Sequence, residues 1–304
     1  MKNCCTIGKF EGIHLGHQAL LKEVIRLSHQ KNLIPTVVVF HPHPYKLLHD
    51  PSYKPLFTPT ERDSLLKNFG IQNIITLPFD QSLVNMEAGC FGTKLTTLAN
   101  TQQIVVGENF RFGKNRTGTI ETLLENNFEV KTVGLWPNVP HKPLKRLGPN
   151  FGVLSTSGVR ALLEEGKLSE AAELLGFSFF IAGEVTKGQQ LGRVLGFPTL
   201  NVYPPGDKFL PAFGVYETLT QIEGGERMQG LTNVGLRPTV TFDQMAQNSV
   251  SVETHIPSLV AKPDEMYGRQ IKVEFIRFIR SERRFDSTEA LQEQIKNDIK
   301  ELQK

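Results

Sequence analysis

The first half of the chain alternates short apolar runs with longer stretches whose apolar residues recur at helical spacing. Each apolar run ends at, or is soon followed by, glycine or proline, which predicts buried strands at residues 4–8, 34–40, 74–77 and 104–106. Helical spacing predicts helices at residues 19–30 and 60–69. Strands that alternate with helices predict a parallel sheet of βαβ units, and such sheets bind ligands beyond the carboxyl ends of their strands.

The second half has a different pattern. After two predicted helices at 158–165 and 168–175, short alternating segments separated by glycine and proline predict the strands of a small antiparallel barrel, at residues 179–185, 199–203, 214–222, 249–256 and 271–279. Residues 288–302 carry apolar side chains at helical spacing and predict a closing amphipathic helix. Because the pattern changes near residues 176–180, we expect two domains, 1–178 and 179–304.

Composition narrows the class of protein. The 304 residues are 39% hydrophobic and 21% charged, which is typical of a globular chain. A net charge of +3 without a basic stripe argues against a nucleic-acid partner. The chain has no apolar run of about 20 residues, so we expect no membrane span. No signal peptide is evident either. The three cysteines, Cys4, Cys5 and Cys90, lack CxxC spacing, which favours buried thiols in a cytoplasmic protein.

The most informative stretch joins the first strand to the first helix and reads GKFEGIHLGH, residues 8–17. Its glycines let backbone approach a ligand closely, and the free N–H groups at a helix N-terminus attract phosphate. His14 and His17 are three residues apart and can donate hydrogen bonds to one ligand. The alternative is that both are surface or capping histidines. A zinc site would need a third ligand, which no HExxH or cysteine pattern supplies.

This stretch resembles the HxGH nucleotidyltransferases, and more closely their FAD synthetase branch with its G-x-F-D-G-x-H-x-G-H motif. Gly8, Phe10, Gly12, His14, Gly16 and His17 match, whereas Glu11 replaces the usual Asp and has a longer side chain. Three further segments match in order: VFHPHP with His43, GENFRFG with Asn109, and LSTSGVR with Ser155, Thr156, Ser157 and Arg160. Turn chemistry or N-capping explains any one segment alone, but not all of them at matching spacing.

The resemblance implies adenylyl transfer, in which the FMN phosphate attacks the α-phosphorus of ATP and pyrophosphate leaves. His14 and His17 are then expected to contact the ATP phosphates, with Gly8, Phe10 and Gly16 shaping that site. Hydroxyls at a helix start and an arginine one turn later suit an anion, so the departing pyrophosphate is expected at Ser155, Thr156, Ser157 and Arg160. Asn109 and His43 are expected near FMN or ATP.

A second glycine-rich stretch, GEVTKGQQLGRVLGFPTLN, covers residues 183–201. It lacks the spacing of a Walker loop, and in a barrel such glycines often serve only turns and bulges. The stretch resembles the riboflavin kinase signature, and further segments match that family in order, at residues 210–216, 233–239, 252–256, 266–268 and 279–291. Residues 257–265 depart from the family pattern, which there carries an aspartate and an aromatic residue.

The kinase resemblance implies roles for residues of the barrel. Glycines and a basic residue are expected to wrap the ATP phosphates, namely Gly183, Gly188, Gly192 and Arg193. Thr199 and Asn201 of the P-T-x-N motif are expected to hold Mg²⁺ and ATP, and Glu253 to be the catalytic base. Glu253 on its own would be an ordinary outward strand carboxylate. Arg280 and Phe285 are expected beside the flavin. The alternative is that Arg280 forms an ion pair with Glu282 and that Phe285 is an ordinary core residue.

The chain as a whole is identified as a member of the bifunctional riboflavin kinase and FAD synthetase family. This implies a Rossmann-like α/β nucleotidyltransferase domain, then a six-stranded antiparallel β-barrel with a C-terminal helix. Its small-molecule substrates would be riboflavin, FMN and ATP, with Mg²⁺ in both domains and FAD as product. The alternative is a nucleotidyltransferase for another phosphorylated substrate, with the barrel as a flavin-binding or regulatory module. The sequence leaves the oligomeric state open.

Overall fold

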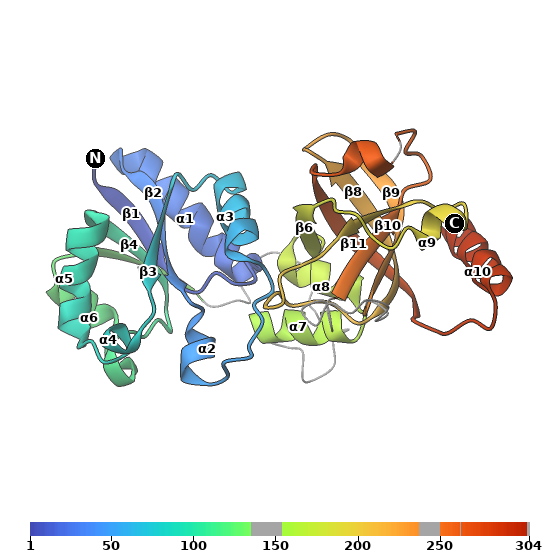
Figure 1. Ribbon diagram of the computed structural model, residues 1–304. Helices are drawn as coiled ribbons and strands as arrows, with labels where there is room; N and C mark the ends of the chain where they lie inside the picture. The colour runs from blue at the N-terminus through green and yellow to red at the C-terminus, as the bar shows by residue number, and fades with distance from the viewer. Residues whose placement is uncertain (135–153, 237–249, 262, 303–304) are drawn as a thin grey trace. The chain divides into compact units, whose positions relative to one another are not determined.

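The computed structural model describes residues 1–134, 154–236, 250–261 and 263–302 (Figure 1). The chain divides into two compact units, Met1–Thr156 and Ser157–Lys304. The two helices before residue 178, which the expected domain boundary at 178/179 assigns to the first domain, group with the second unit.

Within the described residues, the first unit forms a five-stranded parallel sheet in the order β3-β2-β1-β4-β5. The strands are β1 (Asn3–Ile7), β2 (Ile34–His41), β3 (Asn73–Pro78), β4 (Thr101–Gly107) and β5 (Glu129–Val133). All four neighbouring pairs run parallel, which confirms the expected α/β class. Because strand order reverses direction at β1, the carboxyl ends of β1 and β4 form the switch point where such sheets bind ligands.

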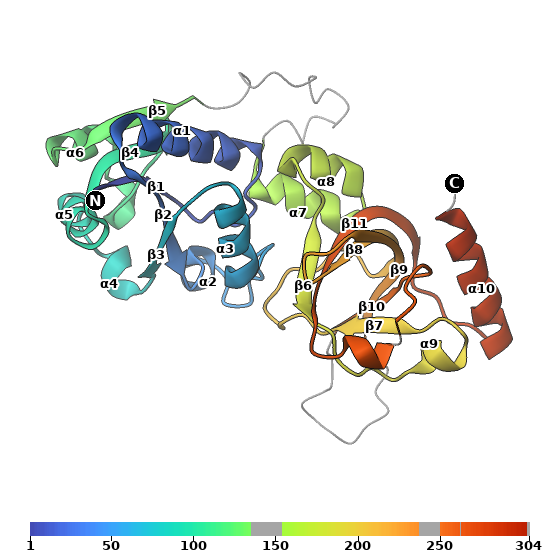
Figure 2. The ribbon, with the colours of Figure 1, turned by 90° about the horizontal axis from the view of Figure 1, so that it is seen from above.

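Helices cover both faces of this sheet. They are α1 (Leu15–Lys31), α2 (Pro44–Leu48), α3 (Pro59–Asn68), α4 (Gln81–Val84), α5 (Ala88–Ala99) and α6 (Ile120–Glu125). Figure 2 shows α1 and α5 on opposite faces of the sheet. Cys5 and Ile7 of β1 belong to the core cluster that α5 covers, so the alternate residues Cys4 and Thr6, also fully buried, face the other side.

Helix α3 shows how local chemistry sets an element's start. Its N-cap is Thr58, whose hydroxyl accepts a hydrogen bond from the Glu61 N–H at 3.2 Å. The Glu61 carboxylate accepts one in return from the Thr58 N–H at 2.8 Å. This capping box fixes the helix entry, one residue earlier than the range expected from apolar spacing.

The second unit begins with helices α7 (Thr156–Glu164) and α8 (Leu168–Leu175). Its described strands form one antiparallel sheet in the order β6-β11-β8-β9-β10-β7. They are β6 (Phe180–Glu184), β7 (Thr199–Val202), β8 (Gly214–Ile222), β9 (Arg227–Leu236), β10 (Val250–His255) and β11 (Gln270–Ser281). The short helix α9 (Leu191–Val194) and the final helix α10 (Thr288–Glu301) complete the unit.

The six-stranded sheet curls until its two edges approach. The Thr186 N–H, just after β6, donates to the Asn201 carbonyl of β7 at 2.8 Å. On the outside, Ile295, Ile299 and Leu302 of the α10 region pack against Val215 and Leu231. The expected antiparallel barrel with a C-terminal helix is therefore confirmed.

Candidate functional sites

The turn after β1 is held in an uncommon backbone conformation. Phe10 and Ile13 both have φ near +45°, a region that bulky residues seldom adopt. Both side chains are fully buried, so packing stabilises a turn that the backbone alone would disfavour. His14 is the N-cap of α1, and its side chain makes no capping hydrogen bond. The side chain of His14 therefore does not cap the helix, which argues against the alternative that it is a capping histidine.

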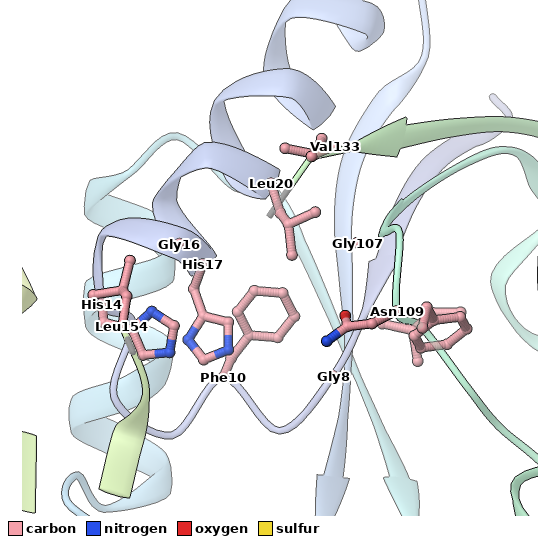
Figure 3. Close-up of a pocket in the computed structure, with 13 residues that line it drawn as sticks. Gly8, Phe10, His14, Gly16, His17, Leu20, Gly107, Asn109, Val133 and Leu154 are labelled. Carbon is pink, nitrogen blue, oxygen red and sulfur yellow. The ribbon is translucent and has the colours of Figure 1, made fainter. Parts of the chain in front are cut away.

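His14 and His17 form a stacked pair. Their ring centroids are 3.9 Å apart with planes 17° from parallel, and the Phe10 ring packs 5.0 Å from His17. Figure 3 shows the three rings side by side, with the Asn109 amide pointing toward Phe10. Among the described residues, neither histidine Nδ1 atom has a hydrogen-bond partner although both are buried. The structure thus brings together the two histidines that the motif predicted.

Burial also sets the charge of this pair. Burial lowers the pKa of His14 to about 4. Burial lowers the pKa of His17 well below its usual value, and the nearby His14 and Lys9 charges lower it further. At neutral pH both rings are therefore uncharged, and each keeps one N–H with which to donate a hydrogen bond.

The stacked pair lines a cavity of about 480 Å³ at the carboxyl ends of β1 and β4. Its walls include several residues that the motifs predicted, namely Gly8, Phe10, His14, Gly16, His17 and Asn109. An added Cβ at Gly16 would lie 3.2 Å from the His14 ring and 3.3 Å from Leu154, so these side chains would have to shift to admit it. Leu20, Val133 and Gly134 also line this cavity and were missed, since they lack a distinctive motif.

A larger cavity of about 680 Å³ shares several walls with the first, including Gly8, His17 and Asn109. Five phenylalanines line it, Phe40, Phe79, Phe91, Phe110 and Phe112. Three positively charged side chains also line it, Lys9, Arg111 and Arg116. Aromatic rings with nearby cations suit a flat aromatic ligand that carries phosphate. The GENFRFG motif identified only the Asn109–Gly113 part of this wall.

Glu11 and His43 lie beside these cavities but line neither of them. The Glu11 Oε2 atom is 3.1 Å from His43 Nε2, and the Glu11 side chain is buried. His43 also caps α2 by accepting a hydrogen bond from the Tyr45 N–H at 3.2 Å. The expected contact of His43 with FMN or ATP stays a prediction.

The LSTSGVR segment spans the boundary between the units. Leu154 lines the smaller cavity, and the Thr156 hydroxyl lies 3.4 Å from the position of a Cβ on Gly12. Arg160 lies within the second unit, where its guanidinium is 4.4 Å from the centre of the Phe209 ring. The expected pyrophosphate contacts of Ser155, Thr156, Ser157 and Arg160 stay predictions.

In the barrel, strand register places Glu253 directly opposite Asn201 on β7 and Asn233 on β9. Directly opposed residues of antiparallel strands project from the same face, so the carboxylate and the Asn201 amide are neighbours. Ser251 donates a hydrogen bond to Glu253 Oε1 at 3.1 Å. Asn201 Oδ1 is buried without a hydrogen-bond partner among the described residues. This carbonyl oxygen is the type of ligand that Mg²⁺ prefers.

Three glycines of residues 183–201, Gly183, Gly188 and Gly192, have close neighbours at the position of an added Cβ, whereas Gly196 has none within 4 Å. An added Cβ would lie 2.6 Å from the Asn201 amide at Gly188, and 2.4 Å from the Phe197 carbonyl at Gly192. At Gly183 it would lie 2.5 Å from Val202. The glycines thus let the loop lie directly on the Thr199–Val202 strand.

The stretch that departs from the kinase pattern supplies a partner for this loop. Arg193 and Asp264 form an ion pair of 2.7 Å, and the hydrogen bond from Arg193 lowers the pKa of Asp264. Residues 237–239 of the fourth matching segment, and residue 262 of the departing stretch, lie outside the described residues.

Arg280 is held by the C-terminal helix. It donates to both carboxylate oxygens of Asp298, with Nη2 2.8 Å from Oδ2, and the Asp298 side chain is only 2% exposed. The partner is therefore Asp298 and not the Glu282 of the alternative interpretation. Phe285 lies 5.8 Å below the Arg280 guanidinium. Contact of Arg280 and Phe285 with flavin stays a prediction.

The fold and sites define a class of protein: an α/β unit whose histidine-bearing turn lies at the switch point of a parallel sheet, as in nucleotide-using enzymes, joined to a barrel with a carboxylate–amide site. Residues 1–138 match the FAD synthetase family model, and residues 175–304 match the riboflavin kinase model. The chain belongs to the family of bifunctional riboflavin kinase/FMN adenylyltransferases. This confirms the family expected from the motifs.

Curated relatives of that name include one from Bacillus subtilis, 31% identical over 99% of this chain and 91% of its own length. Another, from Escherichia coli strain K12, is 31% identical over 96% of this chain and 89% of its own. A crystal structure from Streptococcus pneumoniae, described as a macrolide-efflux protein, has a TM-score of 0.79 and 27% identity, covering 98% of this chain and 93% of that one. In the part of this chain that the structure describes, no helix is long and apolar enough to span a membrane.

Proposed function

We propose that this chain phosphorylates riboflavin to FMN in its barrel and then transfers AMP to FMN, making FAD, in its α/β unit. The observation that carries the proposal is the stacked pair of His14 and His17. It lies in a cavity at the sheet's switch point, next to a larger cavity that suits FMN. A domain boundary at 178/179 would assign adenylyl transfer to residues 1–178 and the kinase reaction to residues 179–304. The family models, which match residues 1–138 and 175–304, support this order of the two activities along the chain.

In adenylyl transfer, a phosphate oxygen of FMN forms a bond to the α-phosphorus of ATP. The bond from that phosphorus to the bridging oxygen breaks, and pyrophosphate leaves with the electron pair. No protein nucleophile is needed, so the protein positions the two substrates and stabilises the developing charge. The neutral rings of His14 and His17 donate hydrogen bonds to phosphoryl oxygens, while Gly8 and Gly16 let the backbone approach them.

In this proposal the two substrates lie on either side of the walls that the two cavities share. ATP occupies the smaller cavity under the histidine pair, and the flavin ring lies among the phenylalanines of the larger one. Asn109 lines both cavities, which puts its amide where the FMN phosphate meets ATP. Arg111 and Arg116 offset the negative charge of the FMN phosphate. Ser155, Thr156, Ser157 and Arg160 receive the departing pyrophosphate, and His43 acts through the buried contact with Glu11.

In the kinase reaction, Glu253 accepts the proton of the riboflavin 5′-hydroxyl as that oxygen attacks the γ-phosphorus of ATP. The bond from that phosphorus to the bridging oxygen breaks, and ADP leaves with the electron pair. Asn201 Oδ1, buried without a partner among the described residues, and the neighbouring Thr199 would hold Mg²⁺. Bound Mg²⁺ neutralises phosphate charge during transfer. Gly183, Gly188, Gly192 and Arg193 cover the phosphates, and Arg280 and Phe285 lie by the flavin.

The proposed substrates are small molecules, and the proposed location is the cytoplasm. All three cysteines are free, which suits a reducing compartment. Cys4 and Cys5 are buried as expected, whereas the expectation of a buried thiol was wrong for Cys90, which is exposed.

The experiment that tests the proposal is a time course with riboflavin, ATP and Mg²⁺, in which FMN and FAD are separated and quantified. FMN should appear first and FAD after it, and chelation of Mg²⁺ should stop both. FMN without FAD would remove the adenylyl-transfer assignment. A chain that makes FAD from supplied FMN but no FMN from riboflavin would remove the kinase assignment.

A further inference from the structure

Glu11 is a buried carboxylate on the turn that carries the histidine pair. It lies three residues before His14, and only 4% of the residue is exposed. A buried carboxylate is costly unless hydrogen bonds replace its lost water. Its partners therefore reveal what the turn is attached to.

Three residues of the 43–56 segment, which follows β2, contact the Glu11 carboxylate. The Tyr53 hydroxyl lies 2.9 Å from Oε1 and 2.8 Å from Oε2, and the Leu56 N–H donates to Oε1 at 3.0 Å. His43 Nε2 approaches Oε2 at 3.1 Å. One carboxylate thus joins the turn to three separate positions of this segment.

The charge of Glu11 agrees with these contacts. Burial raises the pKa of Glu11, but hydrogen bonds from His43, Tyr53 and the Leu56 N–H outweigh it, so that the pKa is lowered. The side chain is therefore ionised at neutral pH and accepts charge-assisted hydrogen bonds, which are stronger than neutral ones.

The contacts continue from Glu11 to the wall of the larger cavity. The Tyr53 ring stacks on His43 with centroids 4.9 Å apart and packs on Tyr45 at 4.6 Å. Tyr45 and its neighbour Pro44 line the larger cavity, whereas His14 lines the smaller one. Glu11 therefore lies between the walls of the two cavities.

A second contact strengthens this connection. Leu56 is fully buried, and its side chain lies 3.4 Å from the position of a Cβ on Gly12. The residue after Glu11 thus packs against the same segment that Glu11 binds. The turn and residues 43–56 meet through both a polar and an apolar contact.

We propose that Glu11 is a positioning residue that fixes the 43–56 wall of the larger cavity to the turn bearing His14 and His17, and so sets the distance between FMN and ATP. This inference rests on the proposed function of the two cavities. Glu11 touches neither substrate and acts through Tyr53 and Tyr45. A positioning role predicts a change in how FMN is used, with little change in how ATP binds.

The test uses the full chain with Glu11→Gln, which keeps the size of the side chain but replaces one acceptor oxygen with a donor amide. FAD formation is measured with FMN varied at saturating ATP. Since a small misplacement of reacting groups can cost about 100-fold in rate, kcat/KM for FMN should fall by about that factor. The dissociation constant of ATP, measured by calorimetry, should stay within about twofold, because the ATP cavity keeps its histidines.

Three controls separate positioning from folding. FMN formation from riboflavin by the same sample should be unchanged, because the barrel carries that reaction. Glu125→Gln, the same substitution at an exposed residue of α6, should leave both reactions unchanged. Tyr53→Phe removes only the hydroxyl that bonds Glu11, and should produce the same loss for FMN without loss of ATP binding.

The inference is wrong if Glu11→Gln and Tyr53→Phe both keep the wild-type kcat/KM for FMN. It is also wrong if the FMN and ATP parameters fall together in Tyr53→Phe, as they would for a merely structural contact. A wild-type chain that makes no FAD from FMN would instead remove the proposed function, and this inference with it.

Discussion

The two candidate sites are built in different ways. In the α/β unit, a turn with two residues at φ near +45° presents His14 and His17 from the end of one strand. In the barrel, Glu253, Asn201 and Asn233 come from three neighbouring strands and are brought together by register alone. The first arrangement depends on packing around one short segment. The second depends on the pairing of strands distant in the sequence.

This difference affects the chemistry of the groups. The stacked histidines are buried enough that both are neutral at neutral pH, which makes them hydrogen-bond donors and not cations. Glu253 is only half-buried and has a hydroxyl neighbour in Ser251, as suits a base that must accept a proton. The turn site thus holds its rings neutral by burial, whereas the strand site keeps its carboxylate partly exposed beside a hydroxyl. Each of the following changes should affect one site and leave the other intact.

The largest expected effect is that of Glu253→Gln. The amide keeps the size and the Ser251 neighbour but is not a base, and a positioned base typically contributes about 10²- to 10⁴-fold. FMN formation from riboflavin should therefore fall by about 10³-fold. The measurement is the rate of FMN release with riboflavin and ATP saturating. Less than a threefold loss would remove Glu253 as the base.

Next is His17→Asn, which removes one ring of the stacked pair and its N–H. Loss of one donor to developing charge costs about 10²- to 10³-fold in comparable sites. The rate of FAD formation from FMN should fall by that factor, with phosphorylation of riboflavin unchanged. Loss of both reactions would indicate that the substitution disturbs folding and not the site.

A smaller effect is expected from Gly188→Ala. The new Cβ would lie 2.6 Å from the Asn201 amide, so the loop must move off β7. FMN formation should fall by about tenfold, because the displaced loop no longer aligns the phosphates. Gly206→Ala is the matched control, since no atom lies within 4 Å of its Cβ position. Equal activity of both variants would contradict a role for the loop.

The smallest effect concerns pH. Because the pKa of His14 in the free chain is about 4, its ring stays neutral as pH falls from 8 to 6. The profile of kcat/KM for ATP in FAD formation should therefore show no decline from His14 near pH 6.5, beyond that of ATP itself. An additional loss centred near pH 6.5 that disappears in His14→Gln would show that the ring titrates normally.

The same pKa affects stability in a defined direction. Between pH 6.5 and 4 the unfolded chain binds a proton at His14 and the folded chain does not, so the free energy of unfolding decreases as pH falls through that window. Glu11 acts in the same direction at lower pH. Its lowered pKa stabilises the fold above its usual value of 4.5, and this contribution is lost as pH falls through the folded pKa.

Local sequence patterns predicted most of the fold. The missed helix α5 shows where such patterns fail, because packing between distant segments can outweigh local propensity. The β-branched, aromatic and apolar residues of 214–222, which begin at a glycine, predicted β8 to the residue. Helix α5 was missed because Gly89, Gly92 and several threonines disfavour a helix. Phe91 and Leu95 of α5 are nonetheless buried in the core, so tertiary packing outweighs local propensity there.

The same limit applies to the sites. His14 and His17 were predicted because three-residue spacing is a local signal. The Asp298 partner of Arg280 and the Tyr53 partner of Glu11 were not predicted, because no local pattern links residues 18 or 42 positions apart. The larger cavity was found only in part, since its phenylalanines come from separate elements that the fold brings together.

The most direct test of two separate sites is to supply FMN and ATP to the Glu253→Gln chain and measure FAD formation. The account predicts the wild-type rate, because the histidine pair and both cavities are unchanged while the barrel carboxylate is lost. A rate reduced in proportion to the loss of kinase activity would contradict it, and would mean that one site serves both reactions.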